Sequence, residues 1–317
     1  MTLTGLFQAS PPDVAVEISG AHVGAARLGW RGTEAVVAAH ATEALPPGAV
    51  VPSLSALNMP DVAVVGQVIA RLLSQLGGRP SRVALVVPDV VAKVSLLKLE
   101  SIPAKASDLQ EIVRWQMRKS APFPMEQAVL SVSPGAVAAE GGHDLVVTLA
   151  RADVVQQYED ACRLAGAHAG LVDLSSCAVI NGVLASHSAP VGDWLLVHVA
   201  DTYLTLAVVR DGSLLFFRNR TDEAEGTLAD LIHQTAMYYE DRLSGKGFAR
   251  VLLAGGARLP DAAAGARRGF EQRLGIATEP VDPRAAIAVA DRISASPELL
   301  DILAPLAGML LRERRVA

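Results

Sequence analysis

The stretch that decides the fold is Asp193 to Arg220, which reads DWLLVHVADTYLTLAVVRDGSLLFFRNR. Three apolar runs of strand length, rich in branched residues, are separated by turn formers, first at Ala200-Asp201 and then at Asp211-Gly212. The Asp-Gly pair is typical of a tight hairpin, because both central positions of such a turn need a positive φ. The stretch therefore predicts a three-stranded antiparallel meander.

A comparable unit lies near the start of the chain, at Asp13 to Trp30, with a strand, a short polar turn that contains a glycine, and a second strand. Two copies of one unit, about 180 residues apart, predict two like halves with a cleft between them. In such folds the turn at the start of each half can face an anion with its main-chain N–H groups. The residues of the two turns therefore bear on whether this chain acts on phosphate.

Composition narrows the class of protein. Of the 317 residues, 51% are apolar and 19% are charged, which favours two or three compact domains over disorder. The net charge of −5 and the lack of a long basic run argue against nucleic-acid binding. No apolar run reaches the ~20 residues of a membrane helix and no secretory signal opens the chain, so we expect a soluble, cytoplasmic protein without direct membrane insertion. Scattered histidines and two cysteines predict neither a metal site nor a disulfide.

The order of elements predicts an insertion in the first half. We expect residues 1–12 to form a loose leader and residues 13–89 and 167–190 to form the first half. After the buried strand at Arg82 to Val87 come a strand, a helix, two more strands and a helix, which predict a small α+β module at residues 90–166. Residues 191–317 form the second half.

Three sequence features resemble PilM-like proteins of type IV pilus assembly. They are Ile102-Pro103 with a following helix that carries Glu111, then Ala121-Pro122-Phe123, and the run Leu252 to Ala257. The resemblance covers about residues 13 to 314 and extends to the related L-components of type II secretion. It implies an α/β fold of duplicated actin-like (ribonuclease H-like) domains, with the 90–166 module as the extra domain of that family.

The resemblance also implies a role. In this family a groove between the module and the first half holds the short cytoplasmic N-terminal tail of a single-span membrane protein, PilN. The chain would then be an adaptor that is peripheral to the inner membrane through its partners, and contact with the pilus motor ATPases is expected as well. The candidate residues for partner binding are Trp115, Met117, Pro122 and Phe123.

The two turns depart from the family pattern, which has Asp-x-Gly and a lysine several residues later. The first turn has Glu17, with Gly24 at the lysine position, and the second has His198 and Ala200. Because phosphoryl transfer needs a cation and a carboxylate that holds metal or water, we expect little ATP hydrolysis and assign no catalytic residue. The residues leave open whether ATP and Mg²⁺ bind. The candidate nucleotide-binding residues are Glu17, Ser19, Gly20, His198, Ala200, Gly255, Gly256 and Ala257.

Several of these residues also have an ordinary structural interpretation. A carboxylate at a strand end, such as Glu17, more often bonds nearby N–H groups, and His198 lies between two valines as a strand histidine does. Asp201 would stabilise its own turn. Trp115 either covers Pro122 and Phe123 or stands exposed as an anchor for a peptide.

Other functions remain open at this point. An ATP-dependent phosphotransferase of the sugar-kinase type shares the fold but needs a positioned carboxylate in the cleft. A membrane-associated filament protein like FtsA would use the arginines at 312, 314 and 315 on acidic lipid, although cations at a helix C-terminus are a simpler account. A component of a type II secretion machine is the remaining alternative.

Overall fold

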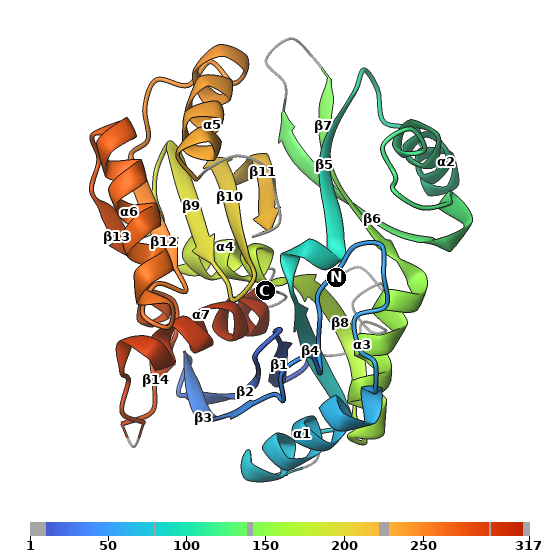
Figure 1. The fold of residues 1–317 in the computed structure, drawn as a ribbon, viewed down its shortest axis with the longest axis vertical. Coiled ribbons are helices and arrows are strands. Elements are labelled where there is room, and N and C mark those ends of the chain that lie inside the picture. The colour runs from blue at the N-terminus through green and yellow to red at the C-terminus, as the bar shows by residue number, and fades with distance from the viewer. Residues whose placement is uncertain (1–10, 79, 138–141, 222–227, 292, 313–317) are drawn as a thin grey trace.

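The computed structural model describes residues 11–78, 80–137, 142–221, 228–291 and 293–312, which form two large sheets, a smaller third sheet, and helices between and outside them (Figure 1). Most of the expected leader lies outside the described residues.

The first large sheet holds the N-terminal meander. Its strand order is β14-β3-β2-β1-β4-β8, in which β1, β2 and β3 are antiparallel neighbours and β4 and β8 add in parallel beyond β1. The strands are β1 (Val14–Ile18), β2 (His22–Arg31), β3 (Glu34–Ala44), β4 (Arg82–Val87), β8 (His168–Leu174) and β14 (Ala288–Val289). Every residue of β1 is buried, and all of them are apolar except Glu17.

The second large sheet repeats the pattern of the first. Its order is β11-β10-β9-β12-β13, again an antiparallel meander followed by two parallel strands. The strands are β9 (Asp193–Val199), β10 (Tyr203–Arg210), β11 (Ser213–Thr221), β12 (Arg250–Ala254) and β13 (Thr278–Pro280). Asp211 and Gly212 have φ of 49° and 80°, as a tight Asp-Gly hairpin requires. The predicted meander and the duplicated α/β architecture are thus confirmed.

The helices of the two halves pack in three pairs around the two sheets. On one face of the first sheet lie α1 (Val62–Gln75) and α3 (Ala152–Leu164), and the outer face of the second sheet carries α5 (Leu228–Arg242) and α6 (Pro260–Leu274). Between the two sheets lie α4 (Ser175–Ala185) and α7 (Pro297–Arg312), which pack against each other. Local signals place these helices: Asp61, for example, accepts the N–H of Ala63 at 2.9 Å and begins α1.

A third sheet, of order β5-β7-β6, forms the inserted module at the upper right of Figure 1. Its elements are β5 (Ala92–Leu99), α2 (Ala106–Met117), β6 (Ala128–Val137) and β7 (His143–Arg151). Val113 and Met117 of α2 pack on Leu145, Val147 and Leu149 of β7, which gives the module a core of its own.

The packing corrects two of the expected boundaries. Helix α3, placed in the module by sequence, buries Tyr158 and Cys162 in the core of the first sheet and contacts α1. The module held by its own core therefore ends with β7. At the other end of the chain, β14 pairs with β3 and α7 packs on β1, β2 and β4, so the C-terminal part of the expected second half lies against the first sheet.

The contact between α4 and α7 generates a stability prediction. A Cβ atom on Gly308 of α7 would lie 1.8 Å from the carbonyl oxygen of Ala178 on α4. Because both are held by helix backbones, we expect Gly308→Ala to destabilise the protein by at least about 1–3 kcal/mol, seen as a lower midpoint of urea unfolding.

The matched control is Gly265→Ala on α6, where a Cβ would meet nothing within 4 Å. That substitution should leave the midpoint unchanged or raise it, because alanine favours a helix by roughly 0.5–1 kcal/mol over glycine. Equal midpoints for the two variants would contradict the close approach of the two helices.

Candidate functional site

The two turns of the duplicated meanders meet in the cleft between the halves. They enclose a cavity of about 30 Å³ lined by Glu17, Ser19 and Gly20 of the first turn and by His198 and Ala200 of the second. Gly255 of the loop after β12 lines it as well. The fold thus brings together six of the eight residues that the sequence singled out, whereas Gly256 and Ala257 do not line this cavity: Gly256 packs on Leu253 and Ala263, and the N–H of Ala257 donates elsewhere.

The first turn is organised by Ser19 and His22. The hydroxyl of Ser19 accepts the N–H groups of Ala21 and His22 at 3.2 and 3.0 Å and lies 2.5 Å from Nδ1 of His22. Nη2 of Arg258 lies 3.1 Å from the same Nδ1. A guanidinium only donates, so Nδ1 accepts and the imidazole proton is on Nε2. That Nε2 is buried without a hydrogen-bond partner among the described residues and lies 3.9 Å from Oε2 of Glu17.

Burial shifts the pKa of both cleft residues toward the neutral form. Desolvation raises the pKa of Glu17 to about 7, against the lowering effect of a hydrogen bond at 2.8 Å from the Ser175 hydroxyl. Desolvation also lowers the pKa of His22 to about 4, and the charge of Arg258 lowers it further. Near neutral pH the site therefore holds a neutral imidazole beside a carboxyl group that is partly protonated.

A second buried cluster joins the halves beside this cavity. The carboxylate of Asp89, fully buried after β4, accepts the N–H and the hydroxyl of Ser176 on α4 and the hydroxyl of Thr205 on β10, the last at 2.6 Å. The Ser176 hydroxyl also lies 2.8 Å from Nδ1 of His198. Sequence reasoning missed Asp89, although its place directly after a buried parallel strand is a signal for a site residue.

Arg258 corrects the expectation of a cleft without a cation. Its guanidinium reaches into the cleft from the loop after β12 and lies 3.8 Å from the carboxylate of Asp201 as well as beside His22. Gly24, which stands at the lysine position of the family pattern, faces Ile302 and Leu306 of α7 instead of the cleft. The cation of this cleft therefore comes from the other half, and Asp201 pairs with it in addition to forming its turn.

The loop after β12, which contains Gly255 and Gly256, binds a side chain of α7. The N–H groups of Gly255, Ala257 and Arg258 donate to the carboxylate of Asp301 at 3.2, 2.6 and 3.3 Å. Sequence reasoning missed Asp301 because it lies within the largely apolar α7 and no local motif marks it. Since this carboxylate already occupies the N–H groups that were expected to face a nucleotide, the loop offers few free donors for one.

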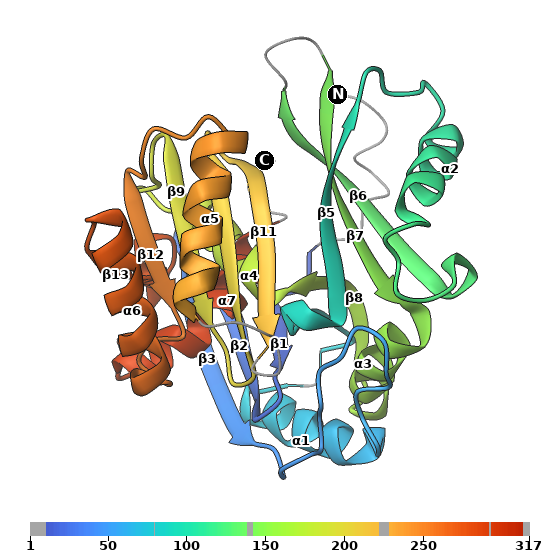
Figure 2. The ribbon, with the colours of Figure 1, turned by 45° about the horizontal axis from the view of Figure 1, so that its top comes forward.

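A large groove lies on the other side of the two turns, between the first half and the module. It measures about 970 Å³ and is lined by residues 50–54 of the loop after β3, 92–94 of β5 and 217–219 of β11, together with both turns. We call it the β5 groove. Figures 1 and 2 both place β11 beside the module strands, and β11 contacts β5 and β6.

The strands that line the β5 groove do so with their edges. Both β5 and β11 are the last strands of their sheets. Each contributes consecutive residues to the lining, whereas a strand that showed a face would contribute alternate ones. Such edges carry backbone groups that an added strand can pair with.

The four partner-binding candidates do not share one surface. Trp115 is 72% exposed on the outer side of α2, as one of the two sequence interpretations required, and borders a hollow with Arg118 and Glu126. Pro122 is exposed as well. Met117 and Phe123 instead belong to or pack on the module core, and Met117 is 1% exposed, so it presents no surface to a partner. None of the four lines the β5 groove.

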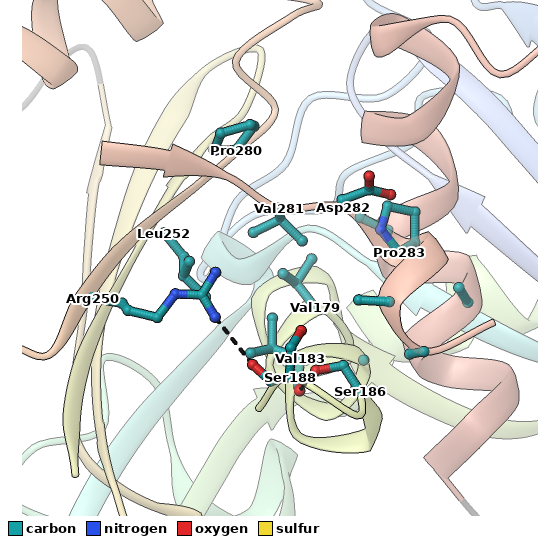
Figure 3. A pocket seen from close by; sticks show the side chains of 15 residues that line it. Val179, Val183, Ser186, Ser188, Arg250, Leu252, Pro280, Val281, Asp282 and Pro283 are labelled. Carbon is teal, nitrogen blue, oxygen red and sulfur yellow. Dashed lines mark hydrogen bonds between the residues drawn. The ribbon is translucent and has the colours of Figure 1, made fainter. Parts of the chain in front are cut away.

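A further pocket, shown in Figure 3, lies where α4, α7 and β12 meet. It measures about 130 Å³, and valine, alanine and proline side chains make up most of its lining. Its charged residues are already engaged, since Arg250 pairs with Glu279 and Asp282 pairs with Arg284. These contacts identify it as a gap in the packing between layers.

Three other sequence expectations concern metal, membrane and lipid. In the part of the chain that the structure describes, no three His, Cys, Asp or Glu residues are grouped as metal ligands, and no helix is long and apolar enough to cross a membrane. Arg312 pairs with Asp173 at 2.5 Å and is thus held by the protein itself. Arg314 and Arg315 lie outside the described residues.

The raised pKa of Glu17 predicts a pH dependence. Because the folded state holds a proton up to about pH 7 that the unfolded state releases near 4.5, ionisation of Glu17 lowers the free energy of unfolding as pH rises between these values. We expect Glu17→Gln, which stays neutral, to gain stability relative to the original protein across that window and to hold a constant difference above pH 7. Urea unfolding at pH 5, 6, 7 and 8 measures it.

His22 acts in the opposite direction, because its unfolded state binds a proton near pH 6.5 and its folded state, with the lowered pKa, only near pH 4, so the free energy of unfolding decreases as pH falls between these values. The comparison therefore uses the difference between the variant and the original protein at each pH, in which the contribution of His22 cancels to first order. A difference that stays constant from pH 5 to 8 would show that Glu17 is ionised throughout.

Comparisons with known proteins agree with this architecture. A solved PilM-PilN type IV pilus biogenesis complex contains a chain with a TM-score of 0.77 and 20% identity, over 94% of this chain and 97% of that one. A Bacteroides thetaiotaomicron protein with an actin-like ATPase fold and unknown function matches with a TM-score of 0.51 and 9% identity, over 92% and 94%. These likenesses establish the actin-like fold. The family model for the type IV pilus assembly protein PilM matches residues 15–241, well over half of the chain, and the chain therefore belongs to the PilM family of type IV pilus assembly proteins.

Proposed function

We propose that this chain is an adaptor of the type IV pilus assembly platform that holds the short cytoplasmic N-terminal tail of a PilN-like single-span membrane protein in the β5 groove. The observation that carries the proposal is the groove itself, which lies between the first half and the module. Family membership and a solved PilM-PilN complex of the same fold support the pilus over a secretion machine, a filament protein or a kinase. The tail would place the chain at the cytoplasmic face of the inner membrane, where contact with pilus motor ATPases is part of the same proposal.

The lining of the groove indicates the chemistry of the tail. Val50, Val51, Leu54 and Val94 give the groove an apolar lining, to which Phe217 of β11 adds an aromatic ring. The strand edges on both sides offer main-chain groups to an extended peptide, which gives affinity with little demand on sequence. Apolar side chains at alternate positions of such a peptide would reach the lining. We therefore expect an extended tail with alternating apolar residues.

The first test is binding of a synthetic peptide with the sequence of that tail, measured by fluorescence anisotropy. Val51 lines the groove and is 56% exposed, so Val51→Asp changes the groove with little effect on folding. We expect at least a tenfold rise in Kd, about 1.4 kcal/mol, because the peptide would desolvate a carboxylate.

Two variants make this test specific. Val191→Asp is the same substitution at an 86% exposed valine outside the groove and should leave the Kd unchanged. Trp115→Ala removes the exposed ring on α2 and should also bind as the original protein does. Loss of binding in Trp115→Ala with normal binding by Val51→Asp would move the tail to the outer side of the module.

The proposal includes little or no ATP hydrolysis. The cavity between the turns is about 30 Å³, Asp301 occupies the loop N–H groups, and Asp201 is paired with Arg258. Glu17 accepts the Ser175 hydroxyl and its pKa is raised by burial, so each of these three carboxyl groups is engaged or partly neutral and poorly suited to hold Mg²⁺. We expect phosphate release from Mg·ATP at the rate of a protein-free blank. Turnover that disappears in Glu17→Gln would instead assign the chain to the ATP-dependent enzymes of this fold.

A further inference from the structure

The loop after β12 binds a carboxylate that belongs to another part of the same chain. The N–H groups of Gly255, Ala257 and Arg258 converge on Asp301, the best of them at 2.6 Å. Main-chain N–H groups that converge in a loop form a binding place for an anion. Helix α7, which carries Asp301, packs on β1, β2 and β4 of the first sheet, whereas the loop belongs to the second. These hydrogen bonds therefore cross from one half to the other.

Arg258 crosses the cleft in the opposite direction. It begins in the loop of the second half, and its guanidinium donates to Nδ1 of His22 in the first turn at 3.1 Å. Asp201, 3.8 Å away in the second turn, supplies a balancing charge. The side chains of Arg258 and Asp201 are 26% and 18% exposed, so water screens this pair only in part. The first turn is thus tied to the second half.

The cleft has little room left once these groups are in place. A water molecule needs roughly 10–15 Å³ of cavity volume, so the cavity of about 30 Å³ between the two turns holds about two water molecules. Gly255, with a φ of 77°, is pressed so closely on the second turn that a Cβ would lie 1.9 Å from the carbonyl oxygen of Val199. A nucleotide could enter only if the halves moved apart and the two bridges broke.

We propose that Asp301 and Arg258 form a built-in latch that closes the two halves without nucleotide, with the Asp301 carboxylate in the place of a bound anion. This goes beyond the adaptor role and does not depend on which partner the chain holds. It has a consequence for the β5 groove, whose lining includes Gly20 and Ala21 from one half and Asp201 and Thr202 from the other. A latched cleft fixes the positions of both sides of the groove relative to each other, so that the groove is formed before a peptide binds.

The distance between the halves tests the latch. Cysteines introduced at the exposed Gln75 on α1 and Arg268 on α6 carry spin labels for pulsed electron resonance. Burial raises the pKa of the thiols of the native Cys162 and Cys177, which disfavours their labelling, and a sample without the introduced cysteines measures any label that they take up. We expect a single narrow distance distribution without nucleotide and no change on adding Mg·ATP. In the double variant Asp301→Ala with Arg258→Ala the distribution should broaden and move to longer distances.

The controls separate the latch from general damage. Asp261→Ala removes an exposed acid from the first turn of α6 and should leave the distribution narrow. Circular dichroism checks that the double variant folds. If it does not, Arg258→Ala alone carries the same comparison, and Arg258→Lys should restore part of the narrow population through its charge. A double variant with the original distribution would overturn the proposal, and so would an original protein that is broad without nucleotide and narrows with Mg·ATP.

Discussion

A fully buried carboxylate between the two halves constrains the rest of the structure. Asp89 is 0% exposed, and an unpartnered charge at such a depth would cost several kcal/mol. Its partners come from both sides, since Ser176 belongs to α4 and Thr205 to the second meander, and its own N–H donates to the hydroxyl of Tyr203. The halves cannot separate at this point without exposing or orphaning the carboxylate. The positions of the two turns follow from that joint.

The joint explains why the cleft has the form of a phosphate site without its chemistry. The turns approach each other as in a nucleotide-binding fold, but the groups that meet there satisfy one another. Arg258 lies against His22 and Asp201, and the carboxylate of Asp301 accepts the N–H groups of the loop after β12. Burial shifts the pKa of Glu17 and of His22 toward the neutral form. The β5 groove beside the cleft remains open to solvent, and its lining combines loop, module and second half. The structure is therefore suited to holding an extended partner across that boundary.

Much of the fold was predictable because local patterns carry it. The Asp-Gly hairpin at 211–212 and the buried strand at Arg82 to Val87 depend on patterns of a few residues, and each lies where the sequence indicated. Their repetition predicted that the turns at Glu17 and His198 would meet. The membership of α3 and α7 was not predictable in this way, because an apolar helix face does not say which sheet it covers. The burial of Met117 was not predictable for the same reason, because only the packed module shows that this side chain faces the module core.

By itself, the sequence determined the two meanders, the strands and helix of the inserted module and the presence of His198 where the family has a carboxylate, because apolar runs, turn residues and motif positions can be read along the chain. Only the tertiary structure decided that the cation of the cleft is Arg258, that Asp301 closes the Gly-Gly loop and that Asp89 joins the halves. These residues lie far from their partners in the chain, and the direction of each side chain depends on how helices and sheets pack. Hydrogen bonds that cross the cleft exist only after both halves have folded and met.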